Sequence, residues 1–66
     1  MYNQLYYQRK RHRFTQQALA EAAAVSRSTI CRLEKNGNFP GFRVALRLCG
    51  ALNCSLQEVF PTDVLL

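Results

Sequence analysis

The sequence has few prolines, glycines and acidic residues, and it has no long apolar run. Its 66 residues include two prolines, three glycines and four acidic side chains. A membrane-spanning helix needs roughly 18 consecutive apolar residues, and no run approaches that length, so we expect no membrane partner. The first residues, MYNQLYYQRKRHR, lack the apolar core of a signal peptide. The short length predicts a single domain over residues 1–66.

Paired cysteines are missing as well. Cys31, Cys49 and Cys54 make an odd count without a CxxC pair, and His12 is the one histidine. This pattern predicts neither a disulfide framework nor a metal site, and it indicates reduced thiols in the cytoplasm. No His, Cys or carboxylate pairing has catalytic spacing, and no glycine-rich phosphate loop is present. We therefore expect no enzyme and no cofactor.

Positive charge is what the chain has in excess. Nine Lys and Arg against four Asp and Glu give a net charge of +5. The usual acidic partner of so basic a short chain is nucleic acid. Charge alone is equally consistent with a basic surface that only keeps the protein soluble, so it does not identify a DNA-binding protein.

Strand-like alternation is missing, whereas apolar residues recur at helical spacing. The pattern predicts a compact all-α fold of five short helices over residues of about 2–12, 16–23, 27–35, 41–52 and 56–60, with a short tail at 61–66. The fourth helix is expected to bury one stripe of side chains: Phe42, Ala45, Leu46, Cys49 and Leu52. SLQE, residues 55–58, is a capping box that opens the fifth helix.

The second and third helices are separated by a break that no side chain explains. Thr15 and Ser26 are both good N-cap residues, yet the residues between them are rich in alanine, the best helix former. Packing must therefore impose the break, and Ala24 is predicted to take a positive φ there. Asn36 and Asn53 are predicted to end the third and fourth helices in the left-handed conformation, which asparagine tolerates.

Two helices that meet at a sharp turn form a helix-turn-helix, whose second helix enters the DNA major groove. The predicted helix at 27–35 has Ile30 and Leu33 on its inward face. Arginine can donate two hydrogen bonds to the O6 and N7 atoms of guanine. The polar side chains on or near the opposite face are Arg27, Ser28, Cys31 and Arg32.

From Leu5 to Phe60 the sequence resembles the phage-repressor and Cro family of helix-turn-helix regulators, the lambda-repressor-like group. Alanine stands at position 24 where the family has a turn glycine, and Asn36 stands where a glycine usually ends the third helix. The matching positions are Arg9, Gln16, Leu19, Ala20, Val25, Ser26, Ile30, Leu33, Glu34, Pro40 and the segment FRVALRLCGALNCSLQEVF.

The resemblance implies a regulator of transcription, expected to be a repressor, that binds double-stranded DNA sequence-specifically as a homodimer on a palindromic operator. It implies an ion pair between Arg9 and Glu34. It places base reading on Arg27, Ser28 and Arg32. The implied contacts to the DNA backbone are Gln16, Ser26, Lys35, Asn36 and Asn38.

Two further expectations concern protein partners. The subunit contact is expected on the fifth helix and the apolar tail, with Val59, Phe60, Val64 and Leu65 as candidates. An alternative function of a different class is an antitoxin-like module that uses the same fold to bind a partner protein, with DNA binding secondary or lost.

Overall fold

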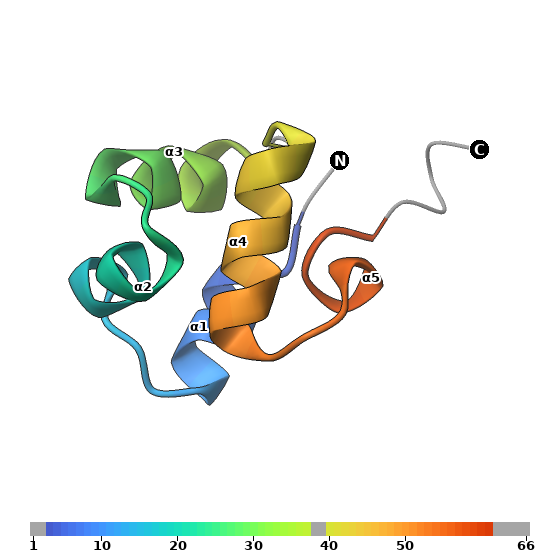
Figure 1. The fold of residues 1–66 in the computed structure, drawn as a ribbon, viewed down its shortest axis with the longest axis horizontal. Coiled ribbons are helices and arrows are strands. Elements are labelled where there is room, and N and C mark those ends of the chain that lie inside the picture. Colours follow the sequence, from blue (N-terminus) through green and yellow to red (C-terminus); the bar gives the residue numbers. More distant parts are fainter. Residues whose placement is uncertain (1–2, 38–39, 62–66) are drawn as a thin grey trace.

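Five helices follow one another in the described part of the chain, which comprises residues 3–37 and 40–61 of the computed structural model. Figure 1 shows α4 in the centre, with α2 and α3 on one side and α5 on the other. The described residues contain no strand, which confirms the predicted all-α fold class. The helices are α1 (Leu5–Arg11), α2 (Gln16–Ala23), α3 (Arg27–Asn36), α4 (Phe42–Leu52) and α5 (Leu56–Val59).

The first helix is shorter than predicted. It begins at Leu5, because the Asn3 side chain accepts a hydrogen bond from the Leu5 backbone N–H at 3.0 Å. Asparagine competes with helix formation in this way. The Gln4 N–H is directed to the backbone oxygen of Val59 at 2.7 Å. Gln4 is thus joined to the last helix instead of extending α1.

The turn between α2 and α3 has the predicted geometry. Ala24 lies in the left-handed region, with φ of 58° and ψ of 42°. The Val25 N–H donates to the Ala20 oxygen at 3.0 Å, and the Val25 side chain packs against the core. The Ser26 side chain accepts from the Thr29 N–H at 3.1 Å and caps α3. Only three residues therefore separate the end of α2 at Ala23 from the start of α3 at Arg27.

The prediction for the end of α3 is wrong by one residue. Asn36 is the last helical residue, and Gly37 takes the left-handed conformation with φ of 70°. Glycine has no Cβ to clash in this conformation, so the break falls on it instead of on the asparagine before it. At the end of α4, Asn53 has φ of 56°, as predicted.

The buried face of α4 differs in part from the predicted stripe. Ala45, Cys49 and Leu52 are buried, but Phe42 is 61% exposed and Leu46 is 50% exposed. The helix presents the side that also contains Leu48 to the core, which places Phe42 and Leu46 to the side of that face. The spacing of apolar residues defines an apolar side of α4, but it does not show which part of that side the neighbouring helices cover.

The last helix closes the core, and two of the four residues predicted for the subunit contact lie in that core. Val59 and Phe60 are both 0% exposed, packed inside their own chain, so their assignment to a dimer interface is wrong. Val64 and Leu65, the other two candidates, lie outside the described residues. The Ser55–Glu58 capping box is present, because each residue's side chain accepts from the backbone N–H of the other.

Replacing Ala24 by glycine should stabilise the protein by about 1 kcal/mol, since the left-handed penalty exceeds the entropy cost of glycine. Ala22→Gly is the matched control, because Ala22 is exposed but helical, and it should destabilise by about 1 kcal/mol. Urea denaturation of the two variants measures both effects. Equal destabilisation by the two substitutions would contradict the break at Ala24.

Candidate nucleic-acid interface

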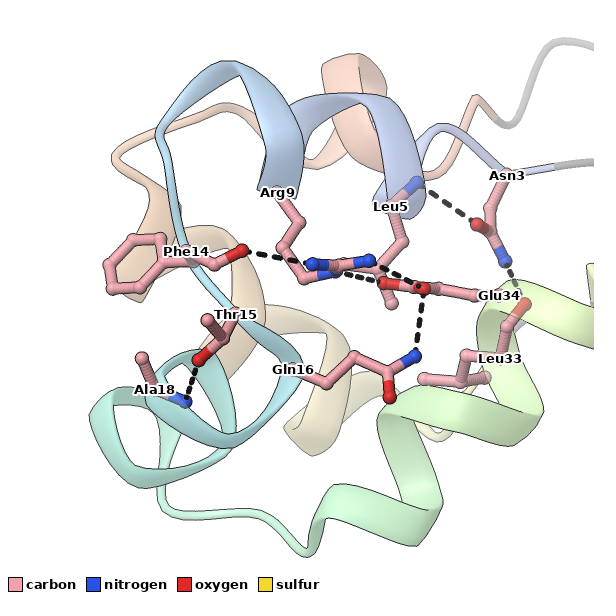
Figure 2. A network of polar contacts seen from close by, with 9 residues as sticks. All are labelled: Asn3, Leu5, Arg9, Phe14, Thr15, Gln16, Ala18, Leu33 and Glu34. Carbon is pink, nitrogen blue, oxygen red and sulfur yellow. Dashed lines mark hydrogen bonds and ion pairs between the residues drawn. The ribbon is translucent and has the colours of Figure 1, made fainter.

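The predicted ion pair between Arg9 and Glu34 is present and joins α1 to the end of α3. Arg9 Nε donates to Glu34 Oε2 at 2.5 Å, and Arg9 Nη2 donates to Glu34 Oε1 at 3.1 Å. Each side chain is only 8% exposed. Arg9 Nη1 also donates to the Phe14 backbone oxygen at 2.9 Å. The guanidinium group thus fixes the α1–α2 loop as well as α3, as Figure 2 shows.

Two more side chains extend this network. Gln16, the first residue of α2, donates through Nε2 to Glu34 Oε1 at 3.1 Å. Asn3 donates through Nδ2 to the Leu33 backbone oxygen at 3.0 Å. One carboxylate therefore holds the start of α2 and the end of α1 against α3 (Figure 2). The orientation of α3 relative to α2 is set by these contacts and by the turn at Ala24.

The candidate base-reading residues lie on the outer face of α3. Arg27, Ser28 and Arg32 are exposed, whereas Ile30 and Leu33 face the core. In a helix-turn-helix, the N-terminal residues of the second helix contact base edges in the major groove. The two arginines are therefore available to an external partner, as base reading requires.

The candidate backbone contacts occupy several positions around α3. Lys35 and Asn36 are exposed in its last turn, and Asn38 lies outside the described residues. The Ser26 hydroxyl is engaged within the chain, since it lies 2.7 Å from Thr29 Oγ1 and also caps the helix. The side-chain amide of Gln16 has two hydrogens, and its hydrogen bond to Glu34 requires only one of them.

A hollow of about 650 Å³ lies where α1 ends and α2 begins. It brings together residues that were not predicted to be part of the site, Lys10, Arg13 and Gln17, with the predicted Gln16 and Arg27. Helix N-termini favour anions, and α2 begins at this hollow. The remaining lining residues are Arg9, Phe14 and Thr15.

Lys10 and Arg13 were missed because a basic run at the end of a helix is more often a solvated face. Arg13 has a positive φ of 62°, so the chain turns sharply between α1 and the Thr15 cap. That turn brings the end of the basic run to the first residues of α2. The sequence feature that could have indicated this contact is the short distance between Arg13 and Thr15, the capping residue of α2, which are two positions apart.

The described residues offer little for other chemistry. Among residues 3–37 and 40–61, no cluster of three or more His, Cys, Asp or Glu side chains is placed to bind a metal ion. Within the same ranges, every helix is too short or too polar to span a lipid bilayer.

Comparisons with known proteins give one family. A family model described as helix-turn-helix matches residues 5–59. An uncharacterized HTH-type transcriptional regulator of Bacillus subtilis is 33% identical over 52 residues, which cover 79% of each chain. An uncharacterized HTH-type transcriptional regulator of Methanocaldococcus jannaschii is 33% identical over 60 residues, which cover 91% of each chain. The residues that the family model matches include α2, the turn at Ala24 and α3.

Replacing Glu34 by alanine should lower the free energy of unfolding by about 3–5 kcal/mol, because Arg9 would remain as a buried, uncompensated charge. Glu21→Ala is the control, since Glu21 is an exposed acid that accepts a hydrogen bond from Gln17 at 3.0 Å. Its effect should stay within about 0.5 kcal/mol. Thermal unfolding followed by circular dichroism measures both variants. Similar melting temperatures for the two would show that the ion pair does not stabilise the fold.

Proposed function

This chain belongs to the helix-turn-helix family, and from that premise we propose that it is a transcriptional regulator that reads double-stranded DNA with α3. The family is not enzymatic, in agreement with the prediction from sequence. The observation that carries the proposal is the placement of the arginines. Arg27 and Arg32 are both exposed on α3, and Arg27 also lines the hollow that contains the basic side chains of Lys10 and Arg13.

Sequence reading is assigned to Arg27, Ser28 and Arg32. A bidentate arginine contact to guanine discriminates against a wrong base by roughly 1–3 kcal/mol. The serine hydroxyl both donates and accepts, so it adapts to more than one base. The inward face of α3 supports this role, because Ile30 is 0% exposed and fixes the helix against the core.

Backbone binding is assigned to the hollow and to the last turn of α3. A DNA phosphate at the hollow would meet Lys10, Arg13 and the first turn of α2. Gln16 would donate its second amide hydrogen to the phosphate while the first stays on Glu34. The additional backbone contacts proposed are Ser26, Lys35, Asn36 and Asn38.

We further propose that two copies bind a palindromic operator as a repressor homodimer. Because Val59 and Phe60 are buried, the contact is assigned to Phe42 and Leu46. These two apolar side chains lie four residues apart on α4, so they share one side of the helix. Their exposure supports an interface there, and the two α3 helices would then lie about 34 Å apart, one turn of DNA.

DNA affinity should fall steeply with salt, because each neutralised phosphate contributes about 0.9 to the slope of log K against log salt concentration. Arg27→Ala should also cost roughly 1–3 kcal/mol on the operator and much less on unrelated DNA. Arg11→Ala removes the same charge from an exposed position outside the hollow and is the control. Fluorescence anisotropy with DNA from upstream of the gene measures these effects.

Two results would contradict this assignment. Binding that does not change with salt would exclude a phosphate-dominated interface. An Arg27→Ala variant that weakens all DNA sequences equally would remove the base-reading role while leaving DNA binding itself intact.

Replacing Phe42 and Leu46 together by serine should weaken self-association at least about tenfold without unfolding the monomer, because both side chains are largely exposed in the monomer. Tyr7→Ser is the control, since Tyr7 is 66% exposed on α1. Analytical ultracentrifugation, with and without operator DNA, gives the dissociation constants. A wild-type protein that is monomeric under both conditions would contradict the homodimer.

A further inference from the structure

The end of α4 brings two cysteines together. Asn53 is left-handed, and the Cys54 N–H donates to the Cys49 backbone oxygen at 3.0 Å. This hydrogen bond, from the residue after the left-handed position to a residue five positions earlier, is the mark of a Schellman motif. The side chains at its two ends frequently touch each other in this motif. Here both of those side chains carry thiols.

The two cysteine side chains also reach the same core. Cys49 is 5% exposed and belongs to the core, and the half-buried Cys54 packs against the same core. Both are free, and so is the third cysteine, Cys31, which is exposed on α3. Figure 1 shows the α4–α5 turn at a distance from α3, so Cys31 is separate from the pair.

Cys54 faces two polar side chains, one on α1 and one at its C-terminal end. Its Sγ lies 3.6 Å from the His12 Nε2 atom, and the thiol donates to Gln8 Oε1 at 3.6 Å. Burial raises the pKa of the Cys54 thiol, and the Glu58 carboxylate raises it further, while Arg11 lowers it. Burial also raises the pKa of Cys49, with additional contributions from Cys54 and Glu58. Both groups therefore rest as protonated thiols.

We propose that Cys49 and Cys54 form a dithiol modification site that exchanges with low-molecular-weight disulfides of the glutathione type. In the first step, Cys54 transfers its proton to the His12 imidazole, and its sulfur attacks one sulfur of the oxidant. A mixed disulfide forms, and one equivalent of the small thiol leaves as a thiolate that takes up a proton. Cys54 is the entry point because it is the more exposed of the two.

In the second step, the sulfur of Cys49 loses its proton to solvent and attacks the Cys54 sulfur. The Cys49–Cys54 disulfide forms, and the second small thiol leaves and is protonated. Two protein thiols are oxidised while one small disulfide is reduced to two thiols. Within the chain, the bond would draw Cys54 away from Gln8 and His12 and tie the end of α4 to the start of α5.

The test is disulfide exchange on the folded full chain. The protein is equilibrated without oxygen in a buffer of reduced and oxidised glutathione, then treated with N-ethylmaleimide and digested with trypsin. Cys49 and Cys54 lie in the peptide 48–66, and Cys31 lies in the peptide 28–32. The expected result is a peptide 48–66 that is lighter by two hydrogens and unalkylated, whereas Cys31 is alkylated.

The contribution of the fold is measured by repeating the equilibrium in denaturant. The effective concentration of the Cys49 and Cys54 thiols for each other should be at least about tenfold higher in the folded protein than in the denatured protein. Cys31→Ser should change nothing, and Cys49→Ala should stop the reaction at a glutathione adduct on Cys54. The proposal is overturned if both thiols of the wild-type pair are alkylated, if the wild type stops at the adduct, or if folding gives no increase.

Discussion

The buried contact of Arg9 with Glu34 is the interaction on which the placement of α3, the helix proposed to read DNA, depends. Two charges that are each 8% exposed are stable together, but either one alone is costly. Because Arg9 also binds the Phe14 carbonyl and Glu34 also binds Gln16, the pair holds three helices at once. Residues on α3 therefore keep one orientation relative to the basic hollow. A protein surface that binds DNA requires this, because the phosphates and base edges of DNA have a fixed spacing.

The second constraint is that the helices must be short. Left-handed residues end three of them, namely Ala24, Gly37 and Asn53, and Arg13 adopts the same conformation just beyond α1. Each such residue reverses the chain within a few positions. The breaks at Arg13 and Ala24 expose the first turns of α2 and α3, which are the parts that can face an anionic partner. Short helices thus form the core and also the surface that is proposed to face DNA.

Local signals in the sequence predicted most of the helix boundaries. Thr15, Ser26 and Ser55 each cap the helix that they were expected to cap, because capping depends on a side chain and its next three residues. The Arg9–Glu34 pair came from the resemblance to a family, since nothing in a spacing of 25 residues specifies a contact.

Burial was harder to predict. Phe42 and Leu46 fit the apolar stripe of α4 but lie beside the core, whereas Val59 and Phe60 were assigned to a surface and are buried. Periodicity defines an apolar side of a helix, but the positions of neighbouring helices decide which part of it is covered. The hollow was missed because Lys10 and Arg13 were interpreted as part of a solvated face, whereas two turns of the chain bring them near Arg27.

The most direct test of the central claim is a map of backbone amide chemical shifts during titration with double-stranded DNA from upstream of the gene. The account predicts the largest changes at Arg13–Gln17 and at Arg27–Arg32, with the amides of α5 unchanged. Saturable changes confined to other surfaces, such as that of Phe42 and Leu46, with α3 unaffected, would contradict it.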